Sequence, residues 1–363
     1  MVSNRPPVLN DHRQRPAIAN RRISCASDTA NAQTENTPVF EEKLKFVCYD
    51  AILYSVNTAR TMIMDLSNFT ESIIKGTPHK KMMPKGSALV LEGGGARAYY
   101  SAGVFEAFMD NGIMFPYIVG VSAGSANALS YVSGQRGRNR IIAEIYVRMK
   151  KYASFRNYLR MGSFFDFDFI FETIPEKHIF WDKEMFDNTD IRFLTGAVNC
   201  ATGKTVWFEK EEIAPGFKVT RASCSIPILS KIVRHNGYDL FDGGISSPIP
   251  IEKSISDGNT FHVIVLTRNR EFVDKPYGPA NLLKLFYRKY PQLIETAIQR
   301  HEIYNRQLAL CEQLERENKA LIIRPQNPLT VEMLETNPKK LLKLYDEGHR
   351  EGLQAIRFFD DIH

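Results

Sequence analysis

Short apolar runs alternate along the chain with longer stretches whose apolar residues recur at helical spacing. A continuous apolar run of about four to eight residues is typical of a buried strand, whereas apolar positions spaced by one helical turn are typical of helices. The pattern predicts strands at 87–91, 117–121, 191–199, 204–208, 238–242, 261–267 and 320–323. It predicts helices at 99–110, 219–225, 280–318 and 338–358, the last of them capped by Asn337. With 363 residues, the chain is long enough for one large α/β domain with additions.

The first 85 residues differ from the rest of the chain. Residues 1–39 are polar, with early prolines and several arginines, and are predicted to form a disordered tail. Residues 40–85 carry apolar side chains at helical spacing and then a basic stretch at 79–86, which predicts a helical extension and a linker. The sequence shows no secretory signal peptide and no run of the ~20 apolar residues that a membrane-spanning helix needs. We therefore expect a protein of the cytoplasm.

The segment Gly120-Val121-Ser122-Ala123-Gly124 follows a predicted strand and begins a stretch of small, helix-forming residues. Gly-x-Ser-x-Gly between a strand and a helix is the pattern of a nucleophile elbow, in which a sharp turn exposes the serine hydroxyl. The flanking glycines Gly120 and Gly124 leave room there for the neighbouring elements. Because a pattern of five residues recurs by chance, the assignment of Ser122 as a nucleophile depends on the rest of the chain.

A second glycine-rich stretch, Gly93-Gly94-Gly95-Ala96-Arg97, lies one predicted strand earlier. A loop between a strand and a helix presents backbone N–H groups to an anion. One interpretation is a dinucleotide site, but the following strand would then end in an acidic residue that binds a ribose, and it ends in the serine pattern instead. The other interpretation is an oxyanion hole, which serine chemistry requires. We favour the oxyanion hole because the two motifs explain each other.

A serine nucleophile also needs a base. His262 lies in a predicted buried strand, and His301 and His349 lie in predicted helices, so each is interpreted as a structural or solvent-facing histidine. Asp242 instead ends a predicted strand and is followed by two glycines, which allow its carboxylate to approach the tip of a neighbouring strand. An aspartate at a strand end is common, so this position alone does not make Asp242 catalytic. Together with the elbow and the glycine loop, it completes a recognisable set of motifs.

Together these residues resemble the patatin-like phospholipases in their bacterial form. The family pattern is a glycine-rich oxyanion loop with a basic residue, a serine elbow and an Asp-Gly-Gly/Ala motif. Here these are Gly93–Arg97, Gly120–Gly124 and Asp242-Gly243-Gly244, in matching order and spacing. The similarity covers about residues 86–270. Ala98 stands where the family usually has glycine, and a small residue at the start of a helix is expected to be tolerated there.

The resemblance implies a three-layer α/β patatin-like fold with a largely parallel central sheet flanked by helices. It implies a catalytic domain at 86–270, with 271–363 as a C-terminal helical region that has one strand and packs on that domain. The implied chemistry needs no cofactor and no metal. Asp242 accepts the proton of Ser122, which attacks a lipid ester, and the N–H groups of loop 93–97 stabilise the oxyanion. Arg97 then either supports this loop or attracts a phosphate.

Composition and charge change this picture little. A net charge of +6 permits an anionic partner without requiring one. The five widely spaced cysteines contain no CxxC pair and indicate neither a disulfide framework nor a zinc site. The basic and aromatic segment 136–160 is interpreted either as an amphipathic helix with a solvated face or as a peripheral membrane contact. The aromatic run at 164–171 either covers the mouth of the site or packs the domain.

We therefore expect a serine lipid acyl hydrolase, that is, a phospholipase, lysophospholipase or esterase that uses a dyad of Ser122 and Asp242. Its expected partner is a phospholipid or another lipid ester, and no nucleic acid is expected. The alternative is a weakly active or inactive patatin-like scaffold that binds a lipid or a regulatory partner.

Overall fold

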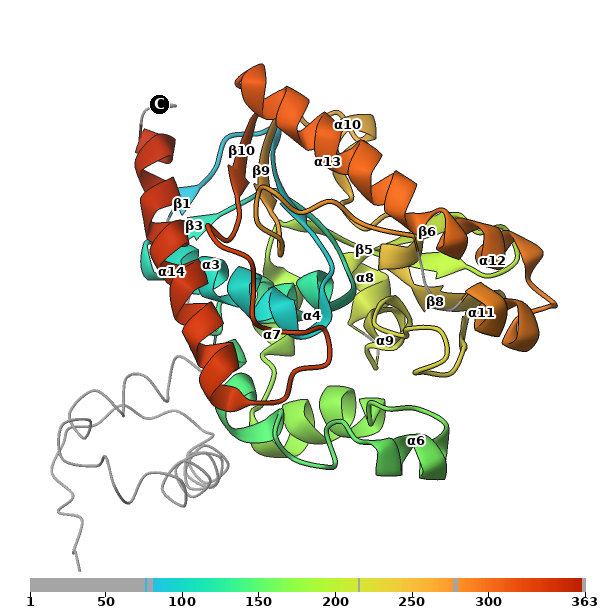
Figure 1. The fold of residues 1–363 in the computed structure, drawn as a ribbon. Coiled ribbons are helices and arrows are strands. Elements are labelled where there is room, and N and C mark those ends of the chain that lie inside the picture. The colour runs from blue at the N-terminus through green and yellow to red at the C-terminus, as the bar shows by residue number, and fades with distance from the viewer. Residues whose placement is uncertain (1–75, 77–80, 215, 277–279, 361–363) are drawn as a thin grey trace, which may run out of the picture. The chain divides into compact units, whose positions relative to one another are not determined.

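The computed structural model of the protein describes residues 76, 81–214, 216–276 and 280–360. A central sheet has the strand order β10-β9-β2-β4-β5-β8-β7, and β6 pairs with β5 (Figure 1). The strands are β2 (Ser87–Leu91), β4 (Tyr117–Val121), β5 (Arg192–Asn199), β6 (Thr205–Glu209), β7 (Val233–His235), β8 (Tyr238–Asp242), β9 (Phe261–Val265) and β10 (Ala320–Ile323). The run from β10 to β5 is parallel, whereas β6, β7 and β8 pair in the antiparallel direction. The sheet is therefore largely parallel, as the sequence predicts.

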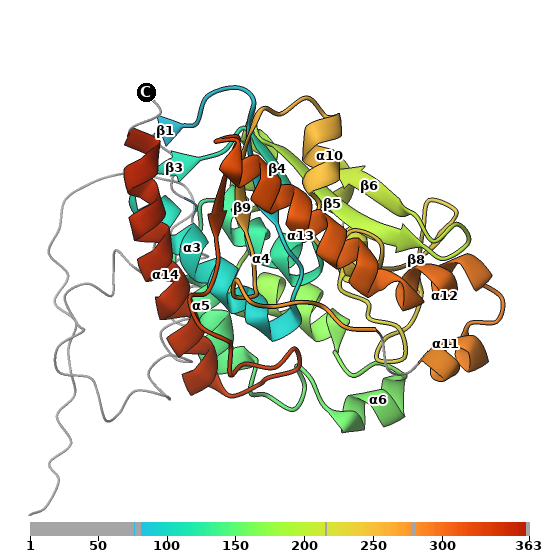
Figure 2. The ribbon, with the colours of Figure 1, turned by 45° about the horizontal axis from the view of Figure 1, so that its top comes forward.

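Helices cover both faces of the sheet. One face carries α3 (Tyr99–Asp110), α4 (Ser122–Val132), α9 (Lys218–Ser223) and α14 (Pro338–Asp360). The other carries α10 (Ile251–Ser256), α11 (Ala280–Phe286), α12 (Pro291–Ile298) and α13 (Arg300–Arg316), and α13 runs across the strands in Figure 2. The shorter elements are the helices α5 (Arg138–Ile141), α6 (Phe155–Met161), α7 (Lys183–Asn188) and α8 (Lys210–Ile213), the 3₁₀ turns η1 (Gly95–Ala98) and η4 (Gly243–Ile245), and the π-helical segments η2 (Ile142–Tyr146) and η3 (Phe169–His178).

Alternate side chains of each central strand enter different hydrophobic cores. In β2, Leu89 and Leu91 pack with the side chains of α3, α4 and α14. Ala88 and Val90, from the same strand, pack with those of α10 and α13. All four side chains are fully buried, which a parallel sheet covered by helices on both faces requires. The protein therefore has three layers, as expected, with the helices of one face separated by the sheet from those of the other.

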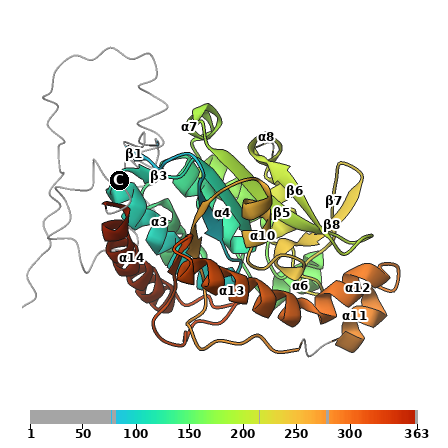
Figure 3. The ribbon, with the colours of Figure 1, turned by 90° about the horizontal axis from the view of Figure 1, so that it is seen from above.

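The C-terminal helix α14 packs closely along α3, as both Figure 1 and Figure 3 show. Glycines allow this approach. A Cβ added at Gly103 would lie 1.9 Å from the carbonyl oxygen of Tyr345, and one at Gly348 would lie 2.0 Å from that of Tyr100. Because α3 follows directly on the glycine loop, this contact fixes the position of the helix that the loop leads into.

Two details of the prediction are wrong. Lys81 and Met82, expected within the linker of 40–85, form β1 (Lys81–Met82), which pairs in parallel with β3 (Ile113–Met114). Two-residue strands carry no hydrophobic pattern, so nothing in the sequence indicates them. Segment 136–160 is not one amphipathic helix, because Gly137 adopts a left-handed φ of 74° and turns separate η2 from α6. The residues predicted to be helical at 280–318 form three helices, and Pro291 begins the second.

The predicted tail at 1–39 and most of the predicted extension at 40–85 lie outside the described residues. The boundary between 86–270 and 271–363 stays a prediction. Among the described residues, no helix is both long and apolar enough to cross a bilayer.

Candidate active site

Ser122 lies at a sharp turn between β4 and α4, where the sequence predicts a strand, a turn and a helix. Its φ of 52° is in the left-handed region, which residues other than glycine rarely adopt. The N–H of Ser122 donates a 2.7 Å hydrogen bond to Oγ of Ser223, which donates in turn to the carbonyl oxygen of Gly196 at 2.6 Å. A Cβ at Gly124 would lie 2.4 Å from the carbonyl oxygen of Glu92, so the tight turn requires glycine at this position.

Two strands approach each other along one edge of β5. β4 pairs with β5 up to Val121, which lies opposite Gly196, and β8 ends at Asp242, which lies opposite Ala197. Because β6 occupies the other edge of β5 at both positions, β4 and β8 must meet end to end. Ser122 comes directly after Val121, and its Oγ donates a 2.7 Å hydrogen bond to Oδ2 of Asp242. The strand order thus joins two residues that lie 120 positions apart in the sequence.

The two glycines after Asp242 contribute in different ways. A Cβ at Gly243 would lie 2.1 Å from the carbonyl oxygen of Gly196, so only glycine fits where the three strands meet. The N–H of Gly244 donates a 2.8 Å hydrogen bond to Oδ1 of Asp242. With Ser122 bonded to Oδ2, both carboxylate oxygens are held in place.

The carboxyl group of Asp242 is buried, with only 6% of the residue exposed. Burial raises the pKa of Asp242 to about 6, against the hydrogen bonds from Ser122 and Gly244 and the positive charge of Arg300, which lower it. A carboxylate with this pKa is ionised at neutral pH, and it accepts a proton more readily than an exposed aspartate does.

The glycine loop lies directly beside the serine, since a Cβ added at Gly93 would lie 3.1 Å from Cβ of Ser122. Three N–H groups of the loop already donate to carbonyl oxygens: Gly93 to Pro248 at 3.3 Å, Ala96 to Met333 at 2.9 Å and Arg97 to Gly94 at 3.2 Å. The N–H groups of Gly94 and Gly95 bond no other described residue. These two are therefore the donors that the loop has left for a ligand.

A C-terminal segment braces this loop. The carbonyl oxygen of Met333 accepts the hydrogen bond from Ala96, and a Cβ added at Gly95 would lie 2.5 Å from that same oxygen. Gly95 also has a left-handed φ of 57°, which favours glycine. Residues 333–336 go on to line the neighbouring cavity. This segment carries no motif, so nothing in the sequence indicates its contact with the loop.

Arg97 does not line the cavity. Burial and the nearby Arg268 lower the pKa of Arg97 to about 10, while Glu92 acts in the opposite direction. The carboxylate of Glu92 is itself buried, which raises its pKa, and it accepts a 2.5 Å hydrogen bond from the N–H of Thr267. Because Arg97 lies outside the cavity and its charge interacts with that of Glu92, which directly follows β2, the interpretation in which Arg97 supports the loop is favoured.

The three candidate histidines are engaged elsewhere, which confirms their interpretation as structural or solvent-facing. Nδ1 of His262 lies 3.0 Å from Oγ of Ser254, and burial lowers the pKa of His262 to about 4. Nδ1 of His301 lies 3.1 Å from the carbonyl oxygen of Ile298. Nε2 of His349 lies 2.8 Å from a carboxylate oxygen of Asp110 on α3. Among the described residues, no group of three or more His, Cys, Asp and Glu side chains is placed to hold a metal ion.

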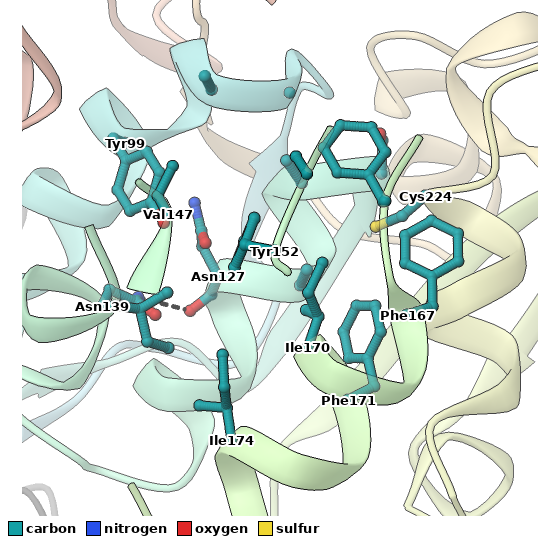
Figure 4. Close-up of a pocket in the computed structure, with 18 of the residues that line it drawn as sticks. Tyr99, Asn127, Asn139, Val147, Tyr152, Phe167, Ile170, Phe171, Ile174 and Cys224 are labelled. Carbon is teal, nitrogen blue, oxygen red and sulfur yellow. Dashed lines mark hydrogen bonds between the residues drawn. The ribbon is translucent and has the colours of Figure 1, made fainter. Parts of the chain in front are cut away.

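A largely apolar cavity is lined in part by Ser122 and by Ala123, Ala126 and Asn127 of α4. Figure 4 shows Asn127 and Asn139 on one side of it and Cys224 and Phe167 on the other. The aromatic run 164–171 is expected from the sequence either to cover the mouth of the site or to pack the domain. Some of its residues line the cavity, and others pack inside the domain. Phe165, Phe167, Ile170 and Phe171 line the cavity, whereas Phe164 and Phe169 are buried and do not line it.

Two further residues of the site were missed by the sequence analysis. Ser223 was predicted only as part of a helix, and nothing in its sequence indicates the hydrogen bond to Ser122. Arg138, which is buried and lines the cavity, was counted among the basic residues of 136–160. No local signal separates it from its exposed neighbours.

Comparisons with known proteins assign two parts of the chain. Residues 89–254 match the family model described as patatin-like phospholipase, and residues 290–362 match a domain of unknown function, DUF6363. The chain is 26% identical over 202 residues to the uncharacterized protein YjjU of Escherichia coli K12. The aligned region covers 52% of this chain and 54% of YjjU. It is 24% identical over 246 residues to lysophospholipase NTE1 of Yarrowia lipolytica, covering 66% of this chain and 16% of that protein.

The match therefore spans about half the length of YjjU and a small part of NTE1. Among solved structures, VipD from Legionella pneumophila is similar over 78% of this chain and 68% of its own, with 12% identity and a TM-score of 0.36.

Proposed function

Because this chain carries a patatin-like phospholipase domain at residues 89–254, we propose that it is a serine lipid acyl hydrolase with Ser122 and Asp242 as its catalytic dyad. The observation that carries the proposal is the 2.7 Å hydrogen bond from Oγ of Ser122 to Oδ2 of Asp242, at one end of a largely apolar cavity. An apolar cavity suits the hydrocarbon chain of a lipid.

The first step transfers the acyl group to the enzyme. Oγ of Ser122 attacks the ester carbonyl carbon while Asp242 accepts its proton. The carbonyl oxygen becomes an oxyanion, and the N–H groups of Gly94 and Gly95 are proposed to bind it, since the other loop amides are already bonded. The ester bond then breaks, and the proton held by Asp242 passes to the departing alkoxide.

The second step releases the acid. A water molecule gives a proton to Asp242 and attacks the acyl-enzyme carbonyl carbon, through a second oxyanion at the same amides. When the bond to Oγ of Ser122 breaks, the proton returns to that oxygen and the fatty acid leaves. The pKa of about 6 for Asp242 suits a group that alternates between base and acid near neutral pH.

The test uses a fluorophosphonate probe and a set of lipid esters. We expect the probe to label Ser122 in the native protein, with no labelling of Ser122→Ala. We expect hydrolysis of phospholipid, lysophospholipid or simple esters to fall to background in Ser122→Ala and in Asp242→Asn. Labelling failure together with no hydrolysis would instead support the inactive lipid-binding or partner-binding scaffold.

The peripheral membrane contact is part of the same proposal. On α6, Phe155 and Leu159 are 75% and 87% exposed, and the neighbouring Arg156 and Arg160 are exposed as well. The preceding Lys150 and Lys151 add positive charge. Exposed apolar side chains among basic residues fit an anionic bilayer surface, where the apolar groups enter the interface and the charges meet lipid headgroups. We also propose that the protein is located in the cytoplasm.

Phe155→Ser combined with Leu159→Ser tests the membrane contact. We expect the double variant to lose most of its binding to vesicles that contain phosphatidylserine, and to hydrolyse a soluble short-chain ester as the native protein does. The matched control is Leu353→Ser, which alters an exposed leucine on α14. Equal vesicle binding by the native protein and the double variant would contradict a contact through α6.

A further inference from the structure

Among the described residues, two charged side chains line the largely apolar cavity, Arg138 and Glu335. Glu335 already pairs with Lys340 at 2.6 Å. Arg138 lines the cavity and is only 6% exposed. Its guanidinium donates to Oγ of Ser130 at 3.2 Å and to the carbonyl oxygen of Ile179 at 3.4 Å, both neutral acceptors. Its Nε is buried and has no hydrogen-bond partner in the described part of the chain.

Within the described part of the chain, no carboxylate pairs with Arg138, and Glu335 is not among the groups that shift its pKa. The groups that interact electrostatically with Arg138 are the phenols of Tyr146 and Tyr99, and burial lowers the pKa of Arg138 to about 10. Arg140, two residues further along the same short helix, pairs with Asp346 at 2.6 Å and is partly exposed. A buried cation without a counter-charge is unfavourable, and an anionic ligand at this position would remove that cost.

The surroundings of Arg138 form a rigid polar end of the cavity. Oγ of Ser130 donates to Oδ1 of Asn139 at 2.9 Å, and Nδ2 of Asn139 donates to the carbonyl oxygen of Asn127 at 2.9 Å. Figure 4 shows this last bond, at the side of the cavity away from Cys224 and Phe167. These bonds hold the partners of the guanidinium in place, so that it needs little reorganisation to bind a planar anion.

The distance from the nucleophile follows from helix α4. Ser122 begins this helix, and Ser130 lies eight residues further on. At ~1.5 Å per residue, the hydroxyl that Arg138 contacts is roughly 12 Å from Ser122 along the helix axis. The cavity-lining residues Ala126 and Asn127 lie between the two on the same helix.

We propose that Arg138 recognises an anionic oxygen group, a carboxylate or a phosphate, that the substrate carries roughly 12 Å from the ester attacked by Ser122. This inference rests on the proposed function and narrows its substrate class. The preferred ester has an apolar middle, which the aromatic wall covers, and a charged far end, which the guanidinium binds. An ordinary fatty acyl chain of the same length leaves Arg138 unpaired.

The test measures binding without turnover, in the Ser122→Ala background. Methyl decanoate and monomethyl sebacate differ only in the far end of the chain, which is a methyl group in one and a carboxylate in the other. We expect Arg138→Met to weaken the binding of monomethyl sebacate by about tenfold or more, and that of methyl decanoate by less than about twofold. Arg138→Lys should keep part of the preference, and the control Arg140→Met should keep all of it.

A third probe, the methyl ester of 8-phosphonooxyoctanoic acid, separates the two sources of the anion. In this probe and in monomethyl sebacate the anionic group is nine bonds from the ester carbon. Tighter binding of this probe than of monomethyl sebacate assigns the site to phosphate, and the reverse assigns it to carboxylate. Melting temperatures of all variants check the fold, and Arg138→Met is expected to melt no lower than the native protein because it removes an unpaired buried charge. Equal effects of Arg138→Met on charged and neutral probes would overturn the proposal.

Different results would contradict the proposed anion site and the proposed hydrolase function. A protein that hydrolyses no ester, but binds the charged probes in a manner that depends on Arg138, keeps the anion site and loses the hydrolase function. A protein that hydrolyses neutral and charged esters equally well, with Arg138→Met as active as the native protein on both, keeps the hydrolase function and loses the anion site.

Discussion

Oγ of Ser223 lies 2.7 Å from the backbone nitrogen of Ser122 and ties the turn that carries the candidate nucleophile to β5. Ser223→Ala leaves that buried N–H without a partner, which costs about 1–3 kcal/mol of unfolding free energy. Because the turn is then less firmly held, we expect kcat on a soluble ester to fall by about 10- to 100-fold while KM changes little. Steady-state kinetics below the melting transition of the variant measure both constants.

The matched control is Ser101→Ala. Ser101 is equally buried, but its hydroxyl has no hydrogen-bond partner among the described residues. Its removal is expected to leave both stability and kcat close to native values. If Ser223→Ala lost no more activity than Ser101→Ala, the hydrogen bond would have no part in positioning Ser122.

The left-handed backbone of Ser122 makes a prediction about stability that does not depend on the reaction. Glycine adopts a φ of 52° without strain, whereas alanine does not. Ser122→Gly should therefore be more stable than Ser122→Ala by about 1 kcal/mol in urea denaturation. At Ser125, inside α4, the order should reverse, because glycine destabilises a helix interior by about 1 kcal/mol relative to alanine. The same order at both positions would argue against strain at the turn.

The pKa of Asp242 predicts how activity depends on pH. The carboxylate must be ionised to accept the proton of Ser122, so kcat/KM should rise with pH through an apparent pKa of about 6 and then reach a plateau. An exposed aspartate would place this rise about two pH units lower. The profile is measured with a soluble ester on protein shown to be folded at each pH. A rate that stays constant down to pH 4.5 would rule out a buried carboxylate as the base.

The same pKa predicts how stability depends on pH. The pKa of Asp242 in the folded protein is raised from 3.8 to about 6, so the folded state holds the proton more tightly than the unfolded state. This contribution to stability is complete below pH 4 and is lost as the pH rises through 6. At pH 8 the native protein bears the cost of burying the ionised carboxylate of Asp242, whereas the neutral amide of Asp242→Asn does not. The variant should therefore be more stable than the native protein at pH 8, by about 1–3 kcal/mol.

Asparagine is suitable for this comparison because its amide has the shape of the carboxyl group and can still bond Ser122 and Gly244. Urea denaturation at pH 4.5 and at pH 8 measures the effect. The advantage of the variant should shrink at the lower pH, and a pH-independent difference would be evidence against the burial of an ionised Asp242.

The strands around the site could be predicted because each is short, apolar and followed by a motif. Gly93–Arg97 and Ser122 come after β2 and β4, and Asp242 is the last residue of β8, so each motif lies at a strand end, as the sequence predicts. What the sequence does not show is that β4 and β8 share one edge of β5. That arrangement depends on β6 occupying the other edge, which is a property of the whole sheet.

The remaining parts of the site come from contacts between distant segments. Ser223 and Met333 act through one hydroxyl and one backbone carbonyl, and neither group has a sequence signature. Arg138 differs from Arg140 only in what surrounds it, because one is buried in the cavity wall and the other pairs with Asp346 near the surface. Periodicity predicts which side chains are buried, but it does not predict which polar group each one meets.

The contact between Met333 and the glycine loop has a consequence for the modular organisation of the chain. The patatin match ends at residue 254, yet β9 and β10 continue the sheet beyond it, and β9 covers the edge of β2. The second matched region, 290–362, supplies β10 and the carbonyl oxygen of Met333, which accepts a hydrogen bond from Ala96. It also supplies α14, which packs closely against α3. A fragment that stops at 254 would leave β2 as an open edge and the loop without its brace. The two regions therefore share one sheet and one set of contacts around the glycine loop, and we expect deletion or exchange of the second region to destabilise the first.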